Sequence, residues 1–170
     1  MPQFCSFPLY HSVSSAFSSV NPTPTIFADL PDCPLPGMST IPTDILCTYL
    51  CPDLVIIFLS RKIIILQFTV PFESNISDAR SRKTDRYSPL ISDLKSSGYF
   101  PQLFTLEVGS CDFISPTNFD ALSSIFPPRS AINLRHLRSD LAHIATICSF
   151  SIVHAHSEPS WSSPNLLSTR

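Results

Sequence analysis

The chain has 170 residues, of which 44% are hydrophobic and 14% are charged, against ~25% charged residues in an average soluble domain. This length is enough for one domain with a buried core. The formal net charge of −2 excludes a protein that attracts phosphate by its overall charge, so any contact with nucleic acid needs a local basic patch.

Glycine is scarce, with 3 residues, whereas the chain has 17 prolines. Few glycines leave few positions where the backbone easily adopts a positive φ, which active-site loops often need. This composition is typical of a fragment, a decayed copy or a reading frame under weak selection. The 6 cysteines are scattered, and we interpret them as reduced thiols.

Residues 1–40 contain Ser/Pro clusters and no sustained hydrophobic period, which predicts a largely irregular leader. The N-terminus lacks a basic region before its apolar residues, so we expect no signal peptide. The most apolar window, 54–72, is interrupted by Ser60-Arg61-Lys62 and is rich in β-branched residues, which excludes a transmembrane segment. We therefore expect an intracellular protein, nuclear or cytoplasmic, without a membrane partner.

The ordered part begins near Ile41, and we expect one domain over residues 41–155 with an irregular tail over 156–170. Two apolar runs, 54–58 and 62–70, are separated by a short polar break. Their length and composition predict a β-hairpin that is buried on both faces.

A helix is predicted from Ile76 to Ser97, because apolar residues recur there at spacings of three and four. Gly98 stands where a helix C-terminus favours a left-handed residue, and Pro89 is a potential kink. The elements expected after it are a strand over Pro101–Val108, a short helix over 117–125 and a long helix over 134–153. A hairpin, a helix, a strand and closing helices predict an α/β (α+β) fold, in which helices pack on a mixed sheet.

Lys83 lies on the apolar face of the predicted helix, where a charge is costly unless it is paired. One interpretation is that its ammonium group extends past the apolar stripe into solvent. The other is that it points at polar side chains on the predicted hairpin. Asp53 opens the first strand directly after Pro52, and Gln67 stands on the second strand.

Four segments in order carry a resemblance to a known family. They are Cys51-Pro-Asp-Leu-Val-Ile-Ile57, Ile65-Leu-Gln-Phe-Thr-Val-Pro-Phe-Glu73, Ala79-Arg-Ser-Arg-Lys-Thr-Asp-Arg-Tyr87 and Leu106-Glu-Val-Gly-Ser110. They resemble the blocks of the restriction-like endonuclease domain, of the PD-(D/E)xK type. That domain is found near the C-terminus of the reverse-transcriptase proteins of some non-long-terminal-repeat retrotransposons.

The resemblance implies a restriction-endonuclease-like fold and Mg²⁺-dependent cleavage of DNA, with Asp53, Gln67 and Lys83 at the catalytic positions. In the family, Asp53 and an acidic residue at the place of Gln67 would hold the metal, since Mg²⁺ prefers charged oxygen ligands. The lysine would stabilise the charge that develops on the phosphodiester. Because Gln67 is neutral, we expect a weakly held metal and an inactive domain. Glu73 and Glu107 are candidate substitute ligands.

Arg80, Arg82 and Arg86 form a short basic run on the same predicted helix. The run is either a solvated helix face or a contact for the DNA backbone. We expect no small-molecule cofactor, and the oligomeric state stays open. Three functions remain: an inactive endonuclease-like domain derived from a retroelement, a non-catalytic module on the same fold that binds nucleic acid or protein, and a reading frame without a selected function.

Overall fold

The computed structural model describes residues 17, 22–29, 40–111, 113–114, 116–126 and 134–157. The strands are β1 (Thr25–Ala28), β2 (Leu54–Ile57), β3 (Lys62–Thr69) and β4 (Phe100–Glu107). They form one four-stranded sheet in the order β1-β2-β3-β4. The first two neighbouring pairs are antiparallel and β3 pairs with β4 in parallel, so the sheet is mixed.

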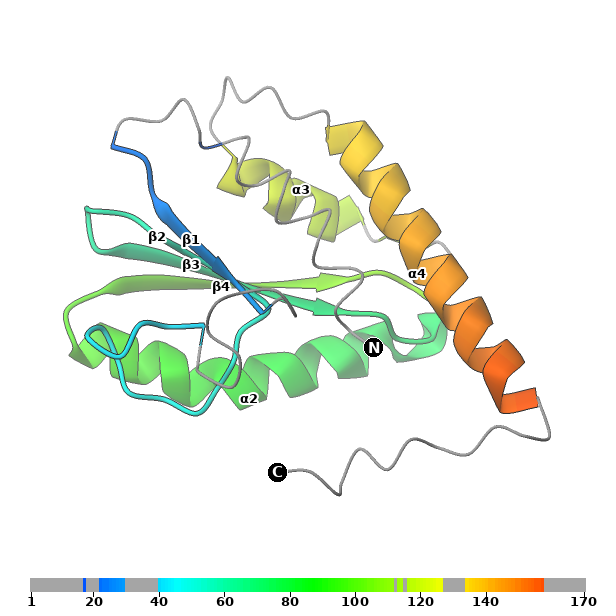
Figure 1. Ribbon diagram of the computed structural model, residues 1–170, viewed down its shortest axis with the longest axis horizontal. Coiled ribbons are helices and arrows are strands. Elements are labelled where there is room, and N and C mark those ends of the chain that lie inside the picture. The colour runs from blue at the N-terminus through cyan, green and yellow to red at the C-terminus, as the bar shows by residue number, and fades with distance from the viewer. Residues whose placement is uncertain are drawn as a thin grey trace.

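Helices cover both faces of this sheet (Figure 1). They are the one-turn 3₁₀ helix η1 (Glu73–Asn75), α2 (Ile76–Ser96), α3 (Pro116–Ile125) and α4 (Leu134–Ser157). Figure 1 shows α2 along one face and α3 with α4 on the opposite side. Because β3 and β4 are parallel, the chain needs a crossover between them, and α2 supplies it. The fold is therefore the mixed α+β arrangement that the sequence predicts.

The hairpin β2–β3 lies between two separate hydrophobic clusters. Ile64 and Leu66 belong to the cluster that includes α4 residues, whereas Ile63 and Ile65 belong to the cluster that includes α2 residues. All four side chains are buried. Since both faces of the strand are covered, its sequence is a continuous apolar run rather than an alternating one. The predicted burial of the hairpin on both faces is confirmed.

Helix α2 buries the face that its sequence spacing predicts. Its buried residues are Ala79, Tyr87, Leu90 and Leu94. The helix continues through Pro89, which is exposed. Gly98 follows the helix with a φ of 82°, a conformation that glycine adopts without a Cβ clash.

Strand β1 is the main difference from the sequence prediction, because it lies inside residues 1–40. It pairs along its whole length with β2, from Thr25↔Ile57 to Ala28↔Leu54. Its four residues lie in a proline-rich segment whose composition predicts irregular structure, so its pairing with β2 rather than its own pattern defines it. Most of the predicted leader, and residues 158–170 of the predicted tail, lie outside the described residues.

Helix α4 runs to Ser157, beyond the predicted end at residue 153. Its buried residues include Leu137, Leu141 and Ala145, which follow the predicted stripe. Within the described part of the chain, no helix has both the length and the apolar character needed to cross a membrane.

Candidate functional site

Asp53 stands at the entrance to β2, directly after the buried Pro52. Its carboxylate oxygen Oδ2 accepts a hydrogen bond from the backbone N–H of Phe68 on β3, at 2.5 Å. Its backbone carbonyl accepts another from the N–H of Asp29, at 3.1 Å. The carboxylate is thus held against β3, the second strand of the hairpin, with 22% of the side chain exposed.

Gln67 lies on β3 beside this carboxylate and faces α2, as its neighbour Ile65 does. Its side chain is 1% exposed. The amide oxygen Oε1 accepts a hydrogen bond from Lys83 Nζ at 3.1 Å. The amide nitrogen Nε2 is buried and has no hydrogen-bond partner among the described residues.

This environment satisfies only the oxygen end of the Gln67 amide. A buried N–H without an acceptor destabilises a protein by about 1–3 kcal/mol. Reversing the amide of Gln67 would place its NH₂ group against the Lys83 ammonium, so neither orientation satisfies both ends of the side chain. A carboxylate carries two acceptors and no donor, so it would exchange the unpaired N–H donor for a second buried oxygen that needs a donor or a cation of its own.

Lys83 reaches the hairpin from α2. It lies four residues from both Ala79 and Tyr87, which are buried on the face of the helix that packs on the sheet. Its Nζ atom lies 4.0 Å from Asp53 Oδ2, and 25% of its side chain is exposed. The separation from Asp53 is at the outer limit of an ion pair, so Lys83 binds the amide oxygen of Gln67 more closely than the carboxylate.

Tyr87 fixes the segment that leads into Asp53. Its hydroxyl group donates a hydrogen bond to the carbonyl of Cys51 at 3.0 Å. Burial raises the pKa of Tyr87 to about 12, and the neighbouring Asp53 carboxylate acts in the same direction. Burial also raises the pKa of Asp53, although the ammonium group of Lys83 partly offsets this. Tyr87 is buried, and the side chains of Lys83 and Asp53 are 25% and 22% exposed, so α2 partly shields the site from water.

The structure brings together Asp53, Gln67 and Lys83, as the sequence predicts. Their catalytic and metal-binding roles stay a prediction. Within the residues described, no group of three or more His, Cys, Asp or Glu side chains is placed to hold a metal ion.

Glu107, a candidate substitute ligand, is instead engaged by protein groups. Its side chain is 0% exposed, and its Oε2 accepts hydrogen bonds from Arg80 Nε at 3.1 Å and Arg80 Nη2 at 2.8 Å. Asn118 Nδ2 donates to the same oxygen at 2.9 Å and to the Glu107 backbone carbonyl at 3.0 Å. The amide oxygen of Asn118 in turn accepts from Arg80 Nη2. The second carboxylate oxygen, Oε1, is buried without a partner among the described residues.

Glu73, the other candidate ligand, lies in η1 and contacts the loop that follows β4. Its Oε1 accepts a hydrogen bond from the backbone N–H of Cys111 at 2.7 Å, and this bond lowers the pKa of the Glu73 carboxyl group. Ser110 Oγ lies 3.5 Å from Glu73 Oε2. The described contacts of Glu73 thus hold the loop, and its metal-binding role stays a prediction.

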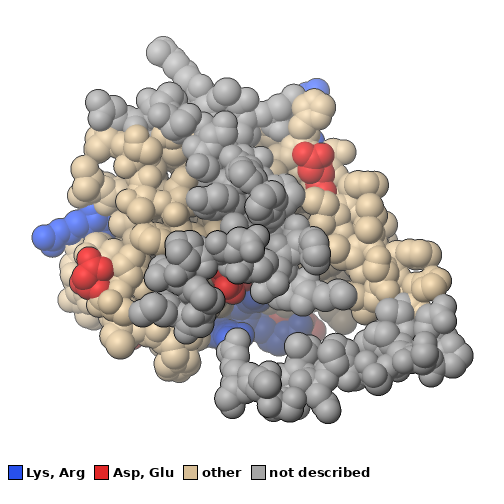
Figure 2. All heavy atoms as spheres, in the orientation of Figure 1, with Lys and Arg blue, Asp and Glu red and all other residues tan. Residues whose placement is uncertain are grey.

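The three arginines of α2 have different environments. Arg80 is bound to Glu107 and Asn118, whereas Arg82 and Arg86 are exposed. The guanidinium group of Arg86 lies 5.8 Å from the centroid of the Tyr87 ring. Figure 2 shows Lys and Arg side chains gathered at the lower edge of the molecule, where Figure 1 shows α2. Arg82 and Arg86 are therefore the two arginines of this run that remain open to a phosphate backbone.

Sequence reasoning missed Asn118 and the pairing of Arg80 with Glu107. Arg80 and Glu107 are 27 residues apart, and Arg80 and Asn118 are 38 residues apart. The one available signal is spacing on α2. Arg80 precedes Lys83 by three residues and so lies on the same side of the helix, one turn nearer its start.

No protein-family model matches the chain, and no curated protein matches it. The geometry of Asp53, Gln67 and Lys83 therefore carries the functional argument alone.

Proposed function

We propose that this protein is a restriction-like endonuclease domain, derived from a retroelement, that has lost its Mg²⁺-dependent cleavage of DNA. One observation carries the proposal. Nζ of Lys83, from the crossover helix, lies 3.1 Å from Gln67 Oε1 on β3 and 4.0 Å from Oδ2 of Asp53, which directly precedes β2. Hairpin, helix, strand and closing helices also follow one another in the order that the resemblance implies.

The environment of Gln67 supports the loss of an acidic residue. The buried site offers the side chain a cation and leaves its NH₂ group without an acceptor. Lys83 and Asp53 already balance one another in charge. A glutamate at position 67 would bring the site to one net negative charge, which a divalent cation would then compensate.

The residues present do not fit Mg²⁺. Asp53 supplies the one carboxylate beside Gln67 and Lys83, and its Oδ2 already accepts the Phe68 N–H. The oxygen of Gln67 is bound to Lys83, and its unpaired NH₂ group would face a cation. Hard divalent cations need several oxygen ligands, preferably charged ones. We therefore derive no metal-assisted step for the chain as it stands.

Retention of nucleic-acid binding without cleavage is the second candidate function. The exposed Arg82 and Arg86 favour it, since both lie on the helix that also carries Lys83. Contacts of this kind recognise phosphate without reading sequence, and they weaken as salt is added.

A nicking assay on supercoiled plasmid, with Mg²⁺ or Mn²⁺, tests the proposal. We expect no nicking by the natural sequence and metal-dependent nicking by Gln67→Glu. We also expect nicking to disappear in Gln67→Glu combined with Asp53→Ala. Ser139→Glu is the control, because it adds the same charge at an exposed position of α4, away from this site.

Thermal melting separates a folding failure from a failure of the idea. Gln67→Glu should melt at a higher temperature when Mg²⁺ or Mn²⁺ is added, because a ligand that binds only the folded state stabilises it. Ser139→Glu should show no such shift. A folded Gln67→Glu protein with neither nicking nor a metal-dependent melting shift would refute the proposal.

A further inference from the structure

A second site lies at the opposite end of β3 from Gln67. It is an open pocket with a volume of about 640 Å³. Its lining residues are Ser60, Lys62, Lys95, Tyr99, Phe100, Pro101 and Gln102. Lys62 begins β3 and Gln67 is five residues further along it, which separates the two sites by ~16 Å at ~3.3 Å per residue.

Backbone hydrogen bonds hold the walls of this pocket. Arg61 in the turn before β3 has a φ of 62°, and its carbonyl accepts a hydrogen bond from the N–H of Phe100 at 2.9 Å. Lys62 and Phe100 are partners in the parallel register of β3 and β4. Gly98 ends the preceding helix, with its N–H bonded to the carbonyl of Lys95 at 3.0 Å. Hydrogen bonds within the protein thus connect the turn at Arg61 with the start of β4 and close the C-terminal end of α2.

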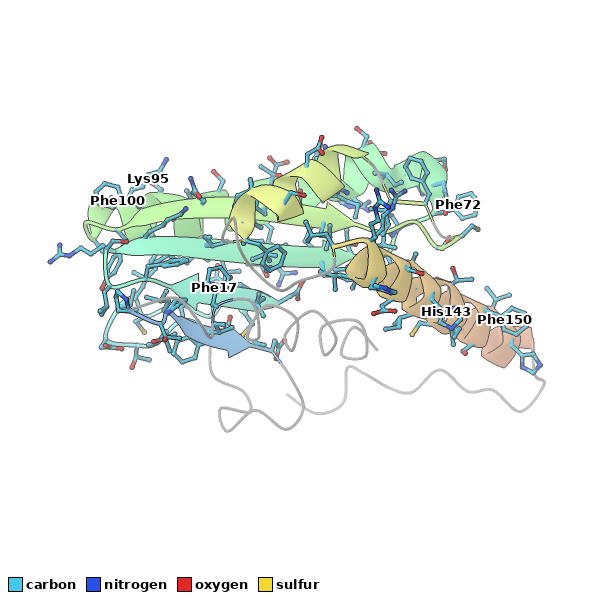
Figure 3. All side chains as sticks on the ribbon, turned by 90° about the horizontal axis from the view of Figure 1, so that it is seen from above. Phe17, Phe72, Lys95, Phe100, His143 and Phe150 are labelled. Atoms are coloured by element: carbon cyan, nitrogen blue, oxygen red, sulfur yellow. The ribbon has the colours of Figure 1, made fainter. Side chains whose placement is uncertain are left out.

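The chemistry of the lining combines positive charge with an exposed aromatic ring. Lys62 and Lys95 are its charged residues, and no acidic side chain of the described residues lines it. Phe100 is 69% exposed, so its ring contributes little to the core. Figure 3 shows Lys95 and Phe100 together at the end of the molecule far from α4. Gln102 adds an amide that can donate and accept hydrogen bonds.

We propose that this pocket binds single-stranded nucleic acid. A base stacks on the Phe100 ring, and the phosphates on either side of it pair with Lys62 and Lys95. Base stacking on an aromatic side chain contributes about 1–3 kcal/mol per base and does not depend on sequence. A duplex keeps its bases stacked on one another, so it offers the pocket only phosphate. This site does not depend on the proposed nuclease site.

Fluorescence anisotropy with a labelled oligothymidylate tests the stacking step. Phe100→Ala should weaken binding by about 5- to 150-fold, which corresponds to the stacking of one base. Phe150→Ala is the matched control, because Phe150 is also 69% exposed and lies on α4 at the far end of the molecule (Figure 3). It should leave the affinity unchanged. Far-ultraviolet circular dichroism checks that both variants fold.

The charge step has its own test in the salt dependence of binding. Changing both Lys62 and Lys95 to glutamine should reduce the slope of log affinity against log salt by about 1.4, since each phosphate contact with a single strand contributes about 0.7. The double variant should also bind the oligothymidylate more weakly at low salt. An unchanged salt dependence of the affinity would show that these lysines do not contact phosphate.

Several results would overturn the inference. They are no binding of oligothymidylate at low salt, equal binding by Phe100→Ala and Phe150→Ala, and equal affinity for single strand and duplex. A loss of binding in Arg82→Ala but not in Phe100→Ala would also overturn it and would assign the nucleic acid to α2. Because the nicking assay depends on Gln67→Glu, either proposal can fail without the other.

Discussion

Replacing Arg80 by alanine tests the ion pair between Arg80 on α2 and Glu107 on β4. Glu107 is 0% exposed and receives two hydrogen bonds from the Arg80 guanidinium group, at 2.8 and 3.1 Å. The variant would leave Asn118 Nδ2, at 2.9 Å, as the described side-chain donor to this carboxylate. A buried charge would then lack its counterion.

The expected loss in the free energy of unfolding follows from the exposures of the Arg80 and Glu107 side chains. Removing one partner of a buried ion pair lowers the free energy of unfolding by about 3–5 kcal/mol. Arg80 is 42% exposed, so water can enter the space that its side chain leaves, and we expect about 2–3 kcal/mol instead. With a urea dependence of about 2 kcal/mol per molar, the unfolding midpoint falls by about 1–1.5 M.

Urea unfolding followed by far-ultraviolet circular dichroism measures this loss. The natural sequence is compared with Arg80→Ala, Glu107→Met and the double variant. The double variant removes the uncompensated charge together with its partner. Its loss should therefore be smaller than the sum of the two single losses, by about 2 kcal/mol. Arg82→Ala, at an exposed position of the same helix, should change the free energy by about 0.5 kcal/mol or less.

Two outcomes would refute the reasoning. The first is a loss in Arg80→Ala no larger than the loss in Arg82→Ala. The second is a double variant whose loss equals the sum of the single losses, because additivity would mean that the two side chains do not act on each other.

Three further predictions concern single side chains. Tyr87→Phe removes the hydrogen bond to the Cys51 carbonyl and should lower the free energy of unfolding in urea by about 1 kcal/mol at neutral pH. Because burial raises the pKa of Tyr87 from 10.0 to about 12, the natural protein should lose stability relative to this variant as the pH rises from 10 to 12; parallel pH profiles would contradict this. Burial also raises the pKa of Asp53 above 3.8, so the folded state favours the protonated acid. The unfolding free energy of the natural protein, relative to Asp53→Asn, should therefore rise as the pH falls from neutral toward 4, and a constant difference would count against the burial of Asp53. Gly109→Ala places a Cβ atom against Glu73 Oε1 and should displace that carboxylate from its backbone donor, with a loss of about 1–2 kcal/mol; an unchanged melting temperature would show that the loop adjusts freely.

Local pattern was sufficient to predict most of the fold. The apolar runs of β2 and β3, the three- and four-residue spacings of α2 and the long stripe of α4 each report which face is buried. They predicted those elements to within a few residues. The same spacing placed Lys83 on the buried face of its helix. Its meeting with Asp53 and Gln67 then required only that the helix cover the hairpin.

The local hydrophobic pattern of the sequence did not predict contacts between distant segments. Strand β1 has four residues and acquires its structure from its register with β2. The burial of Glu107 depends on Arg80 and Asn118, which approach it from two different helices. The unpaired amide nitrogen of Gln67 becomes visible only once its surroundings are folded. Periodicity along the chain records which side of an element is buried, whereas hydrogen-bond partners depend on how several elements meet in space.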